Sequence, residues 1–109
     1  MLLSLDMNNI FKSIPENLSA EVFERLVDND KVRIERIVSK GHASPEHGWY
    51  DQDNSEWVMV LTGEAILSFV DESPITLKQG DYINIPAHRK HKVAWTAPDI
   101  ETIWLAVHY

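Results

Sequence analysis

Two segments of the sequence gather side chains that can bind metals or transfer protons. The first, GHASPEHGWYDQDNSE, runs from Gly41 to Glu56 and contains two histidines, a tyrosine, a glutamine and several carboxylates. The second, IPAHRKH, includes His88 and ends at His91. Imidazole nitrogens and carboxylate oxygens are common metal ligands, and histidine and tyrosine also act as acids or bases. Whether these residues form one site depends on the elements that position them.

The composition is that of one small globular domain. The chain has 109 residues, 44% of them hydrophobic and 25% charged, which suits a single core. The longest apolar run is far shorter than the ~20 residues of a transmembrane helix, and the N-terminus does not resemble a signal peptide, so we expect a cytoplasmic protein. A net charge of −7 and the absence of cysteine disfavour nucleic-acid binding and exclude thiolate ligands. The expected partner is a small molecule or another protein.

One short helix and a series of strands are expected to hold these residues. Residues 19–27, SAEVFERLV, place their apolar side chains at a helical spacing. From residue 32 onward, alternating or short apolar runs are broken by glycine, proline and aspartate, which is typical of an antiparallel sandwich or barrel. Residues 1–31 would form an arm with the helix, and residues 32–109 the barrel of the same domain. The expected strands are 32–38, 48–52, 57–62, 65–70, 75–77, 82–86, 91–95 and 101–108.

The same two segments resemble the sequence motifs of the cupin superfamily. The first motif, G-x5-H-x-H-x3-4-E-x6-G, is matched in part, and the second, G-x5-P-x-G-x2-H-x3-N, is matched with every gap correct up to its histidine. The matching residues are Gly41, His47, Glu56 and Gly63 in the first motif and Gly80, Pro86 and His91 in the second. The strings WYDQ, EWV, IPAH and WLAVHY also resemble a subgroup of small bacterial single-domain cupins. This resemblance implies an all-β barrel, a double-stranded β-helix, with a divalent metal inside.

The first motif departs from the family pattern at its second histidine. Counting forward from His47 places Trp49, which cannot bind a metal, at that position. Counting back from Glu56 places Tyr50 and Gln52 at the two histidine positions. Alternate residues of a strand face the same side, so Tyr50 and Gln52 can both point inward. We therefore prefer the second alignment, in which His47 is not a ligand.

The metal ligands that the resemblance implies are Gln52, Glu56 and His91. An amide oxygen, a carboxylate and an imidazole suit Zn, Fe, Mn or Ni. Because the amide is a weaker donor than imidazole, the site is expected to lose its metal more easily than an intact cupin site. Tyr50 and His88 are the candidate groups for proton transfer beside the metal.

Two other residues are expected to have structural roles. His108, near the end of the last expected strand, is expected to be held by a hydrogen bond. Trp95 is expected to share the inward face of its strand with His91 and Val93. An indole inside the barrel would leave a small cavity, suited to a compact acid or a sugar fragment.

Two functions from different classes remain open. The first is a metal-dependent enzyme that acts on a small polar metabolite by isomerase, lyase or dioxygenase chemistry. The second is a non-catalytic binding or regulatory module with a degenerate metal site. In either case a homodimer is expected, because small cupins often cover exposed sheet edges by pairing.

Overall fold

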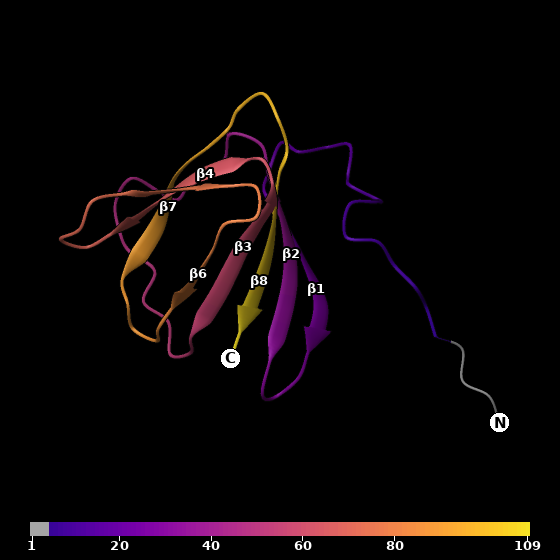
Figure 1. Cartoon of the computed structure of the whole chain (residues 1–109), viewed down its shortest axis with the longest axis horizontal. Coiled ribbons are helices and arrows are strands. Elements are labelled where there is room, and N and C mark those ends of the chain that lie inside the picture. The colour runs from indigo at the N-terminus through magenta and orange to yellow at the C-terminus, as the bar shows by residue number, and fades with distance from the viewer. Residues whose placement is uncertain (1–4) are drawn as a thin grey trace.

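The computed structural model describes residues 5–109, which form eight β-strands in two antiparallel sheets (Figure 1). One sheet has the order β1-β2-β8-β3-β6 and the other the order β5-β4-β7. The expected all-β antiparallel fold is confirmed, but the two sheets are separate layers and do not close into a barrel. The strands are β1 (Val22–Asp28), β2 (Arg33–Ser39), β3 (Glu56–Thr62), β4 (Glu64–Phe69), β5 (Ile75–Lys78), β6 (Tyr82–Ile85), β7 (His91–Thr96) and β8 (Thr102–His108).

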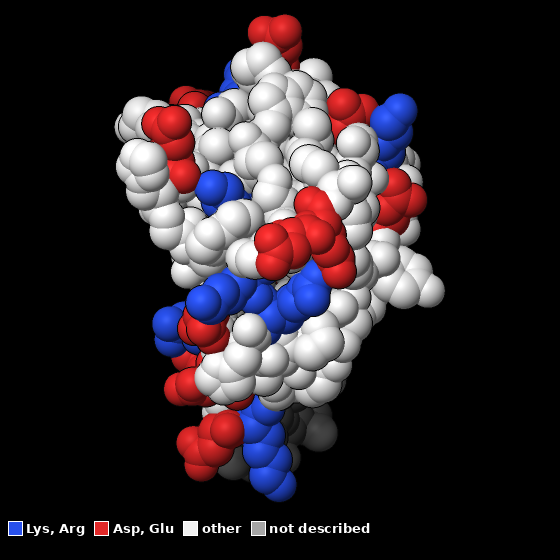
Figure 2. All heavy atoms as spheres, turned by 90° about the vertical axis from the view of Figure 1, so that its left-hand side faces the viewer, with Lys and Arg blue, Asp and Glu red and all other residues white. Residues whose placement is uncertain are grey.

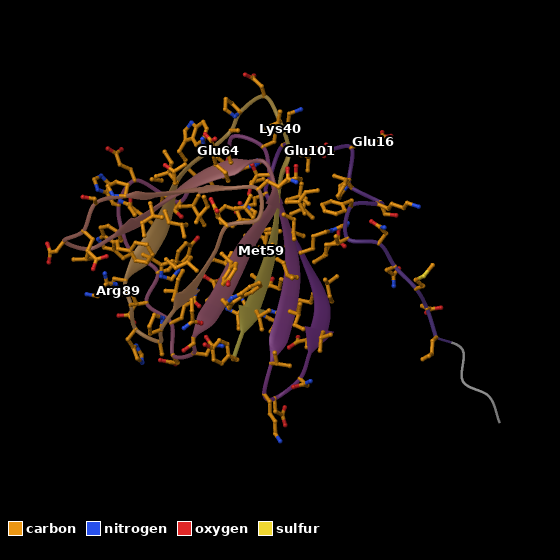
Figure 3. The ribbon with its side chains drawn as sticks, in the orientation of Figure 1. Glu16, Lys40, Met59, Glu64, Arg89 and Glu101 are labelled. Atoms are coloured by element: carbon orange, nitrogen blue, oxygen red, sulfur yellow. The ribbon has the colours of Figure 1, made fainter. Side chains whose placement is uncertain are left out.

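Apolar side chains from both sheets form one core between the layers. In β3, for example, Val58 and Val60 are buried, while Met59 between them is only half-buried on the opposite face. Figure 3 shows side chains in the space between the sheets and labels Met59 on β3, which belongs to the opposite face of that strand. Fully burying a side chain of this kind contributes roughly 1.5–3 kcal/mol, so the cluster is a main source of stability. Its buried members are Val58, Val60, Ala65, Leu67, Phe69, Leu77, Ile85, Trp104 and Ala106.

The helix expected over residues 19–27 is wrong, because Val22–Asp28 is strand β1. It pairs antiparallel with β2 at the edge of the larger sheet. The register shifts between Arg25 and Val27, so Leu26 is an extra residue in a bulge. A bulge interrupts the two-residue alternation of a strand, which explains why the apolar spacing resembles that of a helix. Within residues 5–109, no helix is long and apolar enough to cross a membrane.

The strand expected over residues 48–52 is also absent from the described part of the chain. Only Tyr50 forms an isolated bridge, in which it exchanges backbone hydrogen bonds with His91 of 2.8 and 3.1 Å. The surrounding residues follow an irregular path, with Gly48 at a φ of 100°. The other seven expected strands are observed with ends shifted by at most one residue.

A buried arginine fixes the N-terminal arm to the outer face of the larger sheet. Arg36 of β2 is only 4% exposed. Its guanidinium donates hydrogen bonds to the main-chain carbonyls of Ile10, Lys12 and Ser13 and to the carboxylate of Glu24. In Figure 1, the arm leaves this attachment and runs away from the sheets toward the N-terminus.

Candidate functional site

A cavity of about 340 Å³ lies between the two sheets, next to the irregular segment that precedes β3. Its apolar lining includes Val58, Leu67, Ile85 and Trp104, all of which are buried core residues. Its polar lining is concentrated in a few titratable and hydrogen-bonding side chains. These are Glu21, Arg25, Arg33, Glu35, Ser44, Tyr50, Gln52, Glu56, His91 and His108.

The cavity is small, as expected, but Trp95 is not the reason. Trp95 is 37% exposed and does not line the cavity. The register between β4 and β7 shifts after Ile66, so that Ile66 pairs with Trp95 whereas the next residue, Leu67, pairs with Val93. The bulge at this point turns Trp95 away from the face that Val93 and His91 share. The expected inward position of Trp95 is therefore wrong.

Glu56 and His91 meet in the cavity from opposite sheets. Glu56 is the first residue of β3 and His91 the first residue of β7. Their side chains are 13% and 6% exposed, and 3.4 Å separates Oε1 of Glu56 from Nε2 of His91. The Nδ1 atom of His91 donates a hydrogen bond of 2.8 Å to the carbonyl oxygen of Arg89. This bond fixes the ring so that Nε2 faces the carboxylate.

The main-chain carbonyl that orients His91 belongs to a well-anchored residue. The side chain of Arg89 forms an ion pair of 2.5 Å with Glu72, and its guanidinium lies 5.4 Å from the centre of the Phe69 ring. Arg89 lies on the outer surface near β7 (Figure 3). Figure 2 shows that basic and acidic side chains are interspersed on the face beside it.

The surroundings of His91 raise its pKa. Burial alone would lower the pKa, but the hydrogen bond to Glu56, the hydrogen bond to the Arg89 carbonyl and the charge of Glu56 together raise it above 6.5. Protonated His91 is thus favoured in the folded protein more than in the unfolded chain.

This shift predicts a pH-dependent contribution of His91 to the stability of the metal-free protein. Because the pKa in the folded state is above the unfolded value, the stabilisation is complete below about pH 6.5 and is lost as the pH rises through the raised value. We expect the difference in unfolding free energy between wild type and His91→Gln to shrink from pH 6 to pH 8.5 in urea titrations with chelator. The exposed His47→Gln serves as the control, and a difference that grows with pH would contradict the prediction.

Two cavity residues were not assigned to the site from the sequence, namely His108 and Glu35. Nε2 of His108 lies 3.3 Å from Oε2 of Glu56 and 3.1 Å from Oε1 of Glu35. Glu35 also accepts a hydrogen bond of 2.9 Å from Nε of Arg33. Nδ1 of His108 is buried and has no hydrogen-bond partner among the described residues. The hydrogen bond expected for His108 stays a prediction, and the contacts with the two carboxylates place its side chain beside Glu56 in the cavity.

A signal for these two residues is present in the alternation of their strands. His108 has the same parity as Trp104 and Ala106, which point into the core. Glu35 is the register partner of Ala106 and therefore lies on the same inward face. A charged residue at an inward position of an otherwise apolar strand is a candidate for a buried site.

Gln52 and Tyr50 both line the cavity, whereas His88 does not. The ring of Tyr50 lies 5.8 Å from that of His91, and Tyr50 is 48% exposed. The main-chain carbonyl of Gln52 accepts a hydrogen bond of 2.8 Å from the backbone N–H of His88. The His88 side chain is 63% exposed and pairs with Asp51 through Nδ1 at 2.8 Å. The ligand role of Gln52 and the proton-transfer roles of Tyr50 and His88 stay predictions.

His47 and Trp49 lie outside the main cavity, beside a second hollow of about 210 Å³. Nζ of Lys92 sits 4.5 Å from the centre of the Trp49 ring and donates a hydrogen bond to the Glu46 carbonyl. These contacts fix the segment that covers the start of β7.

The carboxylate of Glu56 and the imidazole of His91 are ligand types that suit a divalent metal. A complete set of metal ligands is not assembled among the described residues. Among residues 5–109, no group of three or more His, Cys, Asp or Glu side chains is placed so that it could hold a metal ion. However, Nδ1 of His91 carries its proton because it faces a carbonyl oxygen, so Nε2 of the neutral ring presents a lone pair to Glu56. Two acceptors in contact require a cation between them, either a proton or a metal ion. Glu56 and His91 therefore supply two donor atoms of the types that divalent metals bind.

The fold and the cavity define a small two-layer β-protein in which a carboxylate and an imidazole converge between the sheets. Within that class, the chain belongs to the cupin family, because the family model of the cupin domain matches residues 34–108. No curated protein matches the chain.

Solved structures with the same fold span several descriptions. A proposed mannose-6-phosphate isomerase from Ralstonia eutropha is 40% identical, with a TM-score of 0.91 and coverage of 95% of this chain and 97% of that one. An RmlC-like cupin with a double-stranded β-helix fold from Methanocaldococcus jannaschii has 20% identity, a TM-score of 0.68 and coverages of 87% and 84%. A polyketide cyclase from Streptomyces resistomycificus has 19% identity, a TM-score of 0.69 and coverages of 81% and 63%. The last two likenesses concern the fold alone.

Proposed function

We propose that this cupin is a metal-dependent enzyme that isomerises a small polar metabolite, with a sugar phosphate as the first substrate to test. The observation that carries the proposal is the buried contact of the Glu56 carboxylate with Nε2 of His91. The cavity of about 340 Å³ has the size of a pocket for a small metabolite. The description of the 40% identical protein as a proposed mannose-6-phosphate isomerase supports the reaction class.

Glu56 and His91, with Gln52 from the irregular segment, would hold a divalent ion of the Zn, Fe, Mn or Ni type. When bound, such an ion supplies polarisation of a substrate carbonyl. The chain itself contributes apolar walls that exclude water from the inner end of the cavity. Tyr50 lines the same cavity and would exchange a proton with the substrate. Arg33, half-buried in the lining, would hold an anionic substituent.

The test is an isomerase assay on protein prepared without chelator. Mannose 6-phosphate and other aldose phosphates are incubated with the protein, and ketose phosphate is followed by NMR. Formation of ketose phosphate that stops with chelator and returns with Mn²⁺ or Zn²⁺ would support the proposal. Turnover that is unchanged after complete metal removal would contradict the metal-dependent mechanism, and the absence of any turnover of these sugars would contradict the substrate class.

A second function, a non-catalytic binding module, is favoured by one specific observation. The position of the second family histidine is occupied by Trp49 or by Gln52, depending on the alignment, and no preformed metal cluster exists among residues 5–109. This function predicts that a sugar phosphate raises the melting temperature and is recovered unchanged. Detection of any product by mass spectrometry would exclude it.

We also propose that the protein is a homodimer that pairs through the outer face of the larger sheet. Met59 lies between its register partners Leu105 and Tyr82 on that face. In the neighbouring row, Trp57 pairs with Val107, and its ring lies 5.4 Å from that of Tyr82. These side chains form a contiguous apolar surface, and such surfaces commonly mark protein contacts.

The dimer is expected to depend on this surface. Met59→Lys places a charge at its centre and should shift the protein from dimer to monomer in light-scattering measurements after gel filtration. Lys40→Glu, an exposed change in the turn after β2, should leave the dimer intact. A monomeric wild type at micromolar concentration would contradict the proposal.

A further inference from the structure

We infer that the distal part of the N-terminal arm, residues 5–9, packs against the larger sheet of a second copy of the chain. In the homodimer proposed above, on which this inference rests, the two copies exchange arms. Two side chains of the distal arm lack cover in the single chain. Leu5 and Met7 are 94% and 95% exposed, although both are large and apolar.

The part of the arm nearer the sheet shows that the outer face of the larger sheet receives apolar cover. Val38 and Ile103 are register partners on this face, and they are 0% and 4% exposed although neither belongs to the core cluster between the sheets. Arg36 holds the arm over the same face, and the arm residues Ile10 and Leu18 are themselves half-buried. The rest of this face stays open.

The open part of the outer face is apolar, but it is small for a dimer contact. Met59 lies at its centre between Leu105 and Tyr82, with Trp57 and Val107 in the next row. All of these except Tyr82, which is 65% exposed, are already half-buried. The largest apolar patch of a monomer usually measures about 300–600 Å², whereas a stable interface takes about 800 Å² from each partner. Two exchanged arms would supply the missing apolar area.

The distal arm is long enough to reach a partner. Ile10 is fixed over β2 by its bond to Arg36, and the five residues from there to Leu5 span up to about 17 Å when extended. Sheets that pack face to face lie only about 10 Å apart. Figure 1 shows that the arm runs away from its own sheets beyond this attachment. It can therefore cross to a partner sheet, and in a two-fold dimer the same contact forms twice.

The order of residues in the distal arm gives it one apolar side. In an extended segment, alternate residues face the same way, so Leu5 and Met7 share one side while Asp6 and Asn8 share the other. The apolar patch around Met59 contains no charged side chain. The side with Leu5 and Met7 therefore suits this patch, and the side with Asp6 suits solvent.

Photochemical cross-linking tests the exchange on the full chain. The sequence lacks cysteine, so Met7→Cys carries a benzophenone label at one position only. Labelled protein is mixed with isotope-labelled wild type, the subunits are allowed to exchange, and the irradiated peptides are identified by mass spectrometry. We expect cross-links from position 7 of one chain to residues 57–59, 82–84 or 105–107 of the other. The same label on Lys40→Cys, in the exposed turn after β2, is the control and should give none.

A charge on the apolar side of the arm should weaken the dimer. Met7→Asp is expected to raise the dimer dissociation constant at least about 10-fold, because it removes a buried apolar side chain from each arm. Asn8→Asp adds the same charge on the opposite side and should change the constant less than about threefold. Analytical ultracentrifugation measures both constants. Both variants should fold, because positions 7 and 8 are exposed in the single chain.

The possible results separate the arm exchange from the dimer and from the proposed reaction. Cross-links confined to one chain, or none to the outer face, would overturn the exchange. A dimer that Met59→Lys dissociates but Met7→Asp does not would also overturn it, while the homodimer would stand. A monomeric wild type at micromolar concentration would overturn both. The isomerase assay is independent of these measurements, so the metal-dependent function stands or falls on its own result.

Discussion

Glu56→Gln should abolish stoichiometric metal binding and lower turnover by at least about 100-fold, because it removes the negative charge that faces both His91 and His108. Glu56 contacts His91 through one carboxylate oxygen and His108 through the other. The amide has nearly the same shape, but it offers one oxygen in place of two and presents an NH₂ group to one of the two rings. The measurement is elemental analysis of the purified variant together with the isomerase assay.

Glu64→Gln is the matched control for this substitution. Glu64→Gln is the same chemical change at the turn of the β3–β4 hairpin. The Glu64 carboxylate is 3.9 Å from Nζ of Lys78, and its side chain is 38% exposed. We expect its metal content and turnover to equal those of the wild type. Full metal content in Glu56→Gln, with near-wild-type circular dichroism, would show that Glu56 is not a ligand.

Gly63→Ala should destabilise the fold by about 2–5 kcal/mol, the largest effect that we expect on stability. Gly63 connects β3 to β4 with a φ of 96°, which is unfavourable for other residues. A Cβ at this position would also lie 2.6 Å from the backbone Cα of Thr102. Backbone cannot move aside as a flexible side chain can, so the turn would have to open. Urea denaturation followed by tryptophan fluorescence measures the loss.

Gly80→Ala separates the two causes. Gly80 has a similar φ of 90°, but no atom lies within 4 Å of the position of an added Cβ. Only conformational strain applies there, so we expect a loss of about 1–2 kcal/mol. Equal losses at the two positions would mean that the close approach to Thr102 does not matter.

The strands from residue 56 to residue 96 could be predicted from the sequence because their boundaries are local. Gly63 and Gly80 mark tight turns, and short apolar runs lie between them. Strand β1 could not be predicted in this way, because the bulge at Leu26 hides its alternation. Its identity as a strand depends on pairing with β2, which is a tertiary interaction.

The motifs predict that Glu56 and His91 share one site, and both residues line the same cavity, but the motifs could not place the other cavity residues. His108 faces Glu35 only because β2, β8 and β3 are neighbours in the sheet. That strand order brings together residues far apart in the chain, and no local pattern encodes it. The bulge that turns Trp95 outward is likewise a property of strand pairing.

The attachment of the N-terminal arm has a practical consequence for protein engineering. Arg36 binds the carbonyl groups of Ile10, Lys12 and Ser13, so it recognises the course of the backbone and not the identity of these side chains. Labels or altered residues can therefore be introduced at positions 10 and 12 without removing the anchor. A fluorophore at position 12 would report separation of the arm from the sheet while leaving the cavity chemistry untouched.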